Sequence, residues 1–453
     1  MKFDLNEYIS EDKAVEGSGG EYDGFFRLCA EVKEAFFREW ERDDNSPAML
    51  EIQKKAIIGY EKERKYFLDR IFSILEEKGM LDEAFPEWYE DLADAVYQED
   101  WGLAGVSEWF GEKYAESSSA KIIGSRIYFM ENGHMVLKKQ TVSADRKNQM
   151  IKAFLLLTPG KRMDSDYYEV YLLDGTRVTV YTEPMTKSGQ AAIVFRRYFI
   201  PSLSFEEQAK RKTIPFEAIP LLSNMAAVGY NVVFMGAVRT AKTTFLATWQ
   251  SYEDPSLEGV MVETDPEIPM HEILPDAPII QLIADGDRLR KLSKNLLRSD
   301  ADYFIMAEAR DGIALDTAVK LATKGTKRMK LTFHSREPGS VALEMATEIV
   351  KSTGGDLPLT MQMVSSAFDY LFHFIQLPDK SQKRLKGIYQ IDCGADGTFR
   401  TEQICRYDPA SESWTFRNCI GERQRSFGEE SDGYHFRRFE EELVRLSEKE
   451  YVK

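Results

Sequence analysis

The chain has 453 residues, of which 43% are hydrophobic and 30% are charged, a composition typical of a globular protein with two or three domains. A net charge of -16 argues against a general role in coating nucleic acid, because that role requires a basic surface. The four cysteines lie far apart without C-x-x-C spacing, so the sequence predicts neither a zinc site nor a disulfide framework.

The first hundred residues are acidic and predict helices. Apolar residues recur at Phe67, Ile71, Ile74 and Leu75, the stripe of an amphipathic helix, and Gly79 supplies a helix stop. Aromatic residues follow this helix, and we interpret them as the packing face of short helices rather than as a ligand surface. They are Trp88, Tyr89, Tyr97, Trp101 and Trp109. We assign residues 1–100 to an acidic helical N-terminal region.

Short alternating segments then predict a small α+β domain over residues 101–204. Two hairpin signals stand out, one at Asn132-Gly133 and one at Asp174-Gly175, and the segment Arg146–Leu157 between them is typical of a helix. From Phe205 the chain alternates helices and strands at longer spacing, which indicates an open, mainly parallel sheet over residues 205–453. The apolar segment Asn231–Met235 is interpreted as a buried central strand.

The segment FMGAVRTAKTTF, Phe234 to Phe245, follows this strand and opens a helix. Gly236, Lys242 and Thr243 fit the phosphate-loop pattern, and Ala241 replaces the second glycine. In such a loop the lysine reaches the β and γ phosphates, and the threonine hydroxyl binds Mg²⁺. The alternative interpretation is an ordinary turn between a strand and a helix.

Polar residues end three later strands. Glu308 follows the apolar segment Tyr303–Met306, Glu263 and Glu267 follow a second strand, and His334 ends a third. Ligands bind at the carboxyl ends of strands in such sheets, so we expect these residues to surround the phosphate loop. Considered alone, Glu308 is also compatible with a solvent-facing strand end. His334 considered alone is also compatible with a structural histidine.

The order of these segments resembles the secretion and pilus motor ATPases of type II and type IV secretion systems, most closely the tight-adherence (Flp) pilus branch. Four segments resemble the family's phosphate loop, acidic box, second acidic motif and histidine box, in the family's order. They are Gly236–Thr244, Val262–Ile268, Leu296–Asp316 and Gly325–Ser335. The likeness extends over about residues 100–417.

The resemblance implies an α/β fold with a RecA-like P-loop NTPase domain, preceded by a small α+β (PAS-like) domain and a helical region. It implies a homohexameric ATPase that binds ATP and Mg²⁺ and couples hydrolysis to pilin assembly or protein export. Nucleotide-contacting positions would be Gly236, Ala237, Val238, Arg239, Thr240, Ala241, Lys242, Thr243, Thr244, Arg177, Arg196, Arg197, Arg310 and His334, with Thr243 as the Mg²⁺ ligand. Glu308, Glu263 and Glu267 would be the catalytic residues.

The family loop is richer in glycine than this one, so we expect ATP binding to be better preserved than rapid turnover. The expected partner is a polytopic inner-membrane platform protein, and no nucleic-acid partner is expected. The absence of an apolar run of about 18 residues and of a signal peptide predicts a cytoplasmic protein, peripherally associated with the cytoplasmic membrane.

Two alternatives stay open. One is a weakly or non-hydrolysing paralogue that acts as a structural or regulatory subunit. The other is a P-loop kinase or a DNA-dependent translocase.

Overall fold

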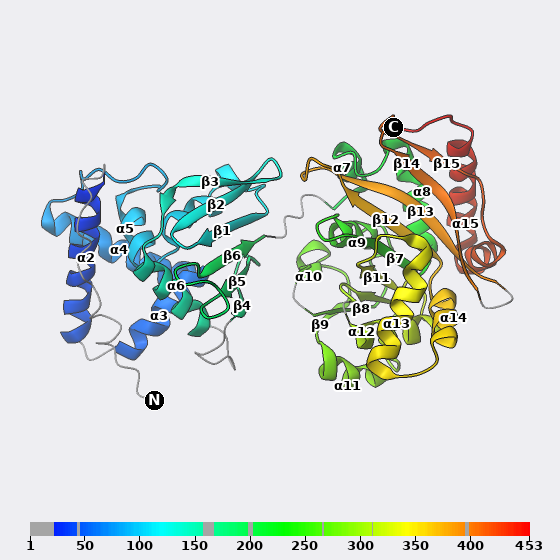
Figure 1. Cartoon of the computed structure of the whole chain (residues 1–453), viewed down its shortest axis with the longest axis horizontal. Helices are drawn as coiled ribbons and strands as arrows, with labels where there is room; N and C mark the ends of the chain where they lie inside the picture. Colours follow the sequence, from blue (N-terminus) through cyan, green and yellow to red (C-terminus); the bar gives the residue numbers. More distant parts are fainter. Residues whose placement is uncertain are drawn as a thin grey trace. The chain divides into compact units, whose positions relative to one another are not determined.

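The computed structural model describes residues 22–42, 46–156, 167–197, 203–264, 267–309, 311–394 and 398–453. The chain forms two compact units, Met1–Phe199 and Ile200–Lys453 (Figure 1), and each is described by itself. None of the helices in these ranges combines the length and the apolar character that a membrane span needs.

The helices described in the first unit pack around aromatic side chains. Trp101 lies 4.7 Å from Phe36 and 5.3 Å from Phe67, measured between ring centroids. The predicted stripe from Phe67 to Leu75 is buried, and Gly79 adopts the left-handed conformation at the helix end, so both predictions are confirmed. The elements are α2 (Asp23–Arg42), α3 (Ser46–Ile58), α4 (Glu61–Lys78) and α5 (Leu92–Asp100), followed by the 3-10 turns η1 (Ala104–Phe110) and η2 (Glu112–Tyr114).

An antiparallel sheet of six strands completes this unit, in the order β3-β2-β1-β6-β5-β4. Without the edge strand β3 the order is that of a PAS-like sheet, which confirms the predicted α+β class. Helix α6 packs Phe154 against Phe195 of the sheet, and both predicted hairpin turns place a glycine at positive φ. The elements are β1 (Ser119–Ile123), β2 (Arg126–Glu131), β3 (His134–Thr141), α6 (Ala144–Leu156), β4 (Tyr167–Tyr171), β5 (Arg177–Tyr181) and β6 (Ala192–Arg196).

The second unit is built on a sheet of nine strands, ordered β15-β14-β13-β12-β7-β11-β10-β8-β9. Strands β12 to β9 of this order run parallel, whereas β13, β14 and β15 are antiparallel. Without the edge strand β9, the parallel strands β7, β8, β10, β11 and β12 can be numbered 1 to 5 in chain order. Their order across the sheet is then 5-1-4-3-2, the order of a RecA-like domain. The predicted α/β class with a RecA-like domain is therefore confirmed.

The strands of the second unit have the following bounds: β7 (Val232–Gly236), β8 (Gly259–Glu263), β9 (Ile279–Ile283), β10 (Tyr303–Met306), β11 (Lys330–Phe333), β12 (Tyr370–Gln376), β13 (Lys383–Cys393), β14 (Phe399–Asp408) and β15 (Ser413–Phe416). Its helices are α7 (Phe205–Lys210), α8 (Ile219–Val228), α9 (Lys242–Gln250), α10 (Met270–Ile273), α11 (Gly286–Leu296), α12 (Gly312–Thr323), α13 (Val341–Thr353), α14 (Leu357–Ala367) and α15 (Glu422–Ser447), with the 3-10 turns η3 (Phe216–Ala218) and η4 (Pro338–Ser340).

Strand β7 is buried on both faces, as its apolar sequence predicts. Val232 and Phe234 point into the core shared with α7, α8, α9 and α15, whereas Val233 and Met235 point into the core under α11, α12, α13 and α14. This alternation follows from the two-residue period of a strand. Helices cover both faces of the sheet at β7, so side chains on either face are buried. This burial explains why every residue of β7 is apolar.

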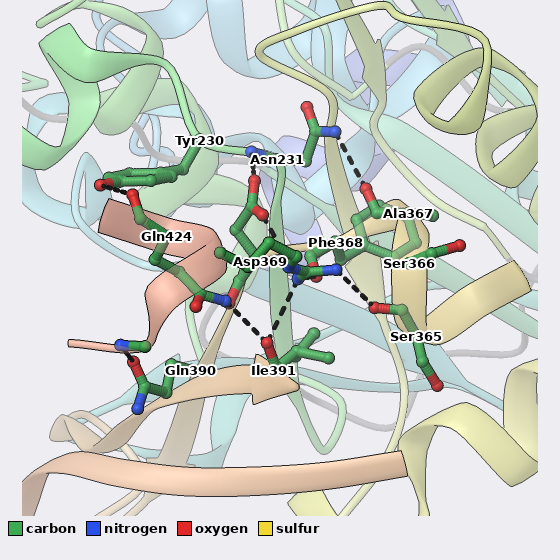
Figure 2. Close-up of polar contacts among 12 residues, drawn as sticks. Tyr230, Asn231, Ser365, Ser366, Ala367, Phe368, Asp369, Gln390, Ile391 and Gln424 are labelled. Carbon is green, nitrogen blue, oxygen red and sulfur yellow. Dashed lines mark hydrogen bonds and ion pairs between the residues drawn. The ribbon is translucent and has the colours of Figure 1, made fainter. Parts of the chain in front are cut away.

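A buried polar network ties the amino end of β7 to β12 and α15 (Figure 2). The Asn231 amide Nδ2 donates to the Ala367 carbonyl over 2.9 Å, and its Oδ1 accepts from the Met329 amide over 2.8 Å. The Asn231 backbone amide donates to the carboxylate of Asp369, which also lies 3.3 Å from the Arg423 guanidinium. These bonds fix the strand that leads into the predicted phosphate loop.

We expect Asn231→Ala to lower the free energy of unfolding by about 2 to 3 kcal/mol, because the substitution leaves a buried carbonyl and a buried amide without partners. The measurement is urea denaturation followed by circular dichroism. Asn224→Ala is the matched control, since Asn224 makes a single exposed hydrogen bond to the Pro220 carbonyl. Equal losses for the two variants would contradict the assigned importance of the network.

Candidate functional site

The predicted phosphate loop lies between β7 and α9, in the strand–turn–helix context that the sequence indicates. Gly236 ends β7 at φ 147°, and a Cβ atom there would lie 2.3 Å from the Phe374 carbonyl oxygen of the neighbouring strand β12. A side chain cannot be accommodated at that distance. The first glycine of the pattern is therefore required by the packing of β7 against β12.

Ala241, at the place of the second glycine, adopts the left-handed conformation with φ 70° and ψ 20°. Arg239 is also left-handed, at φ 66°. The loop thus has backbone conformations that glycine adopts at low cost and other residues adopt at about 1 to 2 kcal/mol each.

The amine of Lys242 lies at the start of α9, where its residue is only 5% exposed. Its Nζ donates to the Ala237 carbonyl over 2.8 Å, and it lies 3.3 Å from Nδ1 of His334. Burial lowers the pKa of Lys242 to about 8, and the negative charges of Glu308 and Glu267 oppose this shift. At neutral pH the amine is therefore mainly protonated and able to bind an anion.

The carboxyl ends of three neighbouring parallel strands carry the predicted polar residues. Strand β11 pairs with both β7 and β10, so His334 and Glu308 follow strands that lie side by side. The His334 Nε2 atom lies 3.5 Å from the Glu308 carboxylate. An ammonium group can only donate, so Nδ1 of His334 accepts from Lys242 and the ring proton lies on Nε2, facing Glu308.

Glu263 at the end of β8 has a different environment. Its residue is 4% exposed, and its Oε1 accepts hydrogen bonds from the backbone amides of Glu267 and Ile268, both over 3.1 Å. The carboxylate therefore holds the backbone of Glu267 and Ile268 in place. It is Glu267 and Glu308 whose charges act on Lys242.

The predicted arginines separate into two groups within the first unit. Arg177 of β5 and Arg196 of β6 are directly paired residues, so their side chains lie on the same face of the sheet. Arg197 is the next residue and donates to the Trp109 and Ala115 carbonyls, with its guanidinium 4.1 Å from the Trp109 ring centroid. Burial lowers the pKa of Arg197, whose contacts are those of a structural residue.

The remaining predicted residues are placed as follows. Thr243 and Thr244 lie in the first turn of α9, and Thr240 donates to the Ala237 carbonyl over 2.9 Å, which closes the loop. Val238 is exposed at the tip of the loop. Arg310 lies outside the described residues.

Sequence reasoning did not single out Lys383, a further cation beside the loop. Strands β12 and β13 extend beyond the Phe374–Gly236 pairing, and Lys383 pairs with Gln376 in this extension. Burial lowers the pKa of Lys383, the charge of Arg239 adds to this effect, and Asp379 opposes it. Its only sequence signal was the basic character of the turn before β13.

The sequence matches no model of a known protein family and no curated protein. Several solved structures are similar at low identity. The VirB11 ATPase from the Brucella suis type IV secretion system, in complex with sulphate, is 14% identical, with 63% of this chain and 92% of that chain covered and a TM-score of 0.33.

Two further structures have comparable values. The ATPase DotB of Yersinia pseudotuberculosis is 15% identical, with 81% of this chain and 89% of that chain covered and a TM-score of 0.47. The pilus retraction motor PilT with bound ADP is 12% identical, with coverages of 74% and 91% and a TM-score of 0.44. The fold assignment rests on the strand order described above.

We expect Ala241→Gly to raise the free energy of unfolding by about 1 kcal/mol, because glycine adopts the left-handed conformation without a Cβ clash. Ala247→Gly, in the interior of the same helix, should lower it by about 1 kcal/mol. Chemical denaturation of both variants checks the opposite signs. A loss for Ala241→Gly equal to that for Ala247→Gly would show that residue 241 is not left-handed.

Proposed function

We propose that the chain is an ATP-binding motor subunit of a secretion or pilus-assembly ATPase of the tight-adherence branch. The observation that carries the proposal is the convergence of Lys242, His334 and Glu308 at the carboxyl edge of a sheet with RecA-like strand order. A phosphate loop next to an acidic strand end is the arrangement of enzymes that cleave nucleotide phosphates. The sequence resemblance supplies the secretion or pilus context.

In this proposal the phosphates of ATP replace the Ala237 carbonyl as the partner of Lys242. The backbone amides at the start of α9 add donors, because the first amides of a helix have no partner within the helix. Thr243 offers its hydroxyl to Mg²⁺, which would take its other ligands from phosphate oxygens and water and would neutralise charge on the phosphates. Among the described residues no cluster of three or more His, Cys, Asp or Glu side chains could hold a metal.

Glu308 is the residue we assign to orienting the attacking water, and Glu267 adds negative charge beside Lys242. His334, in contact with both Lys242 and Glu308, would transmit the state of the nucleotide to strand β11. Glu263 acts as a positioning residue through its bonds to the Glu267 and Ile268 amides. Arg310 retains the nucleotide-sensing role that the resemblance implies.

Arginines of the small domain complete the proposed mechanism. The resemblance assigns Arg177 and Arg196, which share one sheet face, to contact with the nucleotide phosphates, where a cation would stabilise the charge that develops during hydrolysis. Arg197 is assigned to the structure of its own unit, where it packs on Trp109. The domains would be residues 1–100, 101–204 and 205–453.

The proposed assembly is a homohexamer in the cytoplasm, peripheral to the membrane, which acts on a polytopic platform protein. The acidic balance of the chain would suit basic cytoplasmic loops of that partner.

Lys242→Ala is expected to lower kcat/KM for ATP at least about 100-fold, because the variant loses the buried amine at the start of α9. The measurement is phosphate release by the purified protein, with size-exclusion chromatography as the check on assembly. Lys291→Ala, an exposed lysine of α11, is the matched control and should retain wild-type turnover. Wild-type protein that assembles but shows no Lys242-dependent turnover would instead indicate a structural or regulatory subunit.

ATP affinity should decrease about 25-fold between about pH 7.5 and about pH 9.5, because only the protonated amine of Lys242 binds phosphate and its pKa is about 8. The affinity for ATP is highest well below this pKa, where the amine is protonated, and it decreases as the pH rises through the pKa. Titration of a fluorescent ATP analogue measures the profile. Lys242→Arg should flatten it, since a guanidinium does not titrate in this range, and an unchanged slope in that variant would exclude Lys242 as the titrating group.

A further inference from the structure

A surface cavity of about 460 Å³ lies in the second unit, between the segment that joins α7 to η3, strand β13 and the turn from β14 to β15. Its apolar lining includes Ile214 and Trp414, which are buried, and Phe216, which is 62% exposed. The volume is within the range of small-molecule sites. None of its lining residues belongs to the candidate nucleotide site.

The residues that line this cavity include a buried arginine. Arg384 is 1% exposed, and it donates to the Lys383 carbonyl and to the Gln382 side-chain oxygen, both over 2.8 Å. Among the residues that the structure describes, no carboxylate lies within ion-pair distance of this guanidinium. A buried charge usually has a counter-ion, because neutral oxygens do not offset the full cost of removing a cation from water.

The other charges of the lining are also mainly positive. Lys212 and Lys453 are exposed at the cavity, and Glu412 is the acidic residue among the described residues that line it. Lys212 and Lys453 are exposed to solvent. A bound anion therefore contacts their ammonium groups without burying another charge that lacks a counter-ion. The excess of positive charge is notable on a chain with a net charge of -16.

We propose that this cavity binds a small organic anion. A carboxylate or phosphate group of the ligand contacts Arg384 and Lys212, and an apolar or aromatic portion lies against Phe216 and Trp414. Arginine and lysine together recognise such oxyanions through charge-assisted hydrogen bonds. The indole Nε1 of Trp414 already donates to the Leu385 carbonyl over 2.7 Å, so its contribution to the ligand is the apolar ring.

Isothermal titration calorimetry of the full chain, with ADP and Mg²⁺ in excess to occupy the phosphate loop, tests this proposal. The probes are phenyl phosphate and phenylacetate, and benzyl alcohol is the neutral analogue. We expect saturable binding of at least one anion in wild-type protein and in Lys242→Ala, and no binding of benzyl alcohol. The tighter anion identifies the acidic group of the ligand.

Lys212→Ala should weaken the binding of that anion about tenfold, the loss of one charge-assisted hydrogen bond. Lys291→Ala, an exposed lysine elsewhere in the same unit, should leave it unchanged. Arg384→Gln should abolish it, and circular dichroism checks that this buried variant folds. The proposal is overturned if neither anion binds saturably, if benzyl alcohol binds equally well, or if Lys212→Ala binds as wild type does.

Discussion

The structure of the candidate site depends on one cation held at low exposure, the amine of Lys242. Burial opposes its charge, while Glu267 and Glu308 favour it, and the resulting pKa of about 8 keeps the amine protonated at neutral pH. Its direct contacts are the Ala237 carbonyl and the ring of His334. A neutral oxygen is a weaker partner for an ammonium group than an anion is, so the loop favours a negatively charged ligand.

A rigid sheet holds this amine in position. Strand β7 lies between β11 and β12, and the Asn231 network fixes the end opposite the loop. Further along β11, Lys330 forms a fully buried ion pair with Glu253, over 2.7 Å. This pair joins β11 to the segment that follows α9, the helix that begins at Lys242. The loop is thus supported from both neighbouring strands and from its own helix.

Residues of the same type at similar positions in the sequence have different contacts in the structure. Arg196 and Arg197 are adjacent, yet the two-residue period of a strand sends them to opposite sides, one beside Arg177 and one against Trp109. Glu263 and Glu308 both end apolar strands, but the carboxylate of Glu263 accepts two backbone amides, whereas Glu308 faces His334. Chemical type and position in a strand therefore do not suffice to assign a role.

The sequence by itself determined the α/β class, the buried strand before Gly236 and the polar ends of the later strands, because these follow from local periodicity and residue type. Only the tertiary structure decided that Gly236 is required by a carbonyl of β12, that Ala241 is left-handed, and that the charge of Arg239 in the loop acts on Lys383. Those features depend on strands that are more than a hundred residues apart in the chain or on backbone angles. The same holds for the charge of Arg384, since a sequence does not show whether a buried cation has a counter-ion.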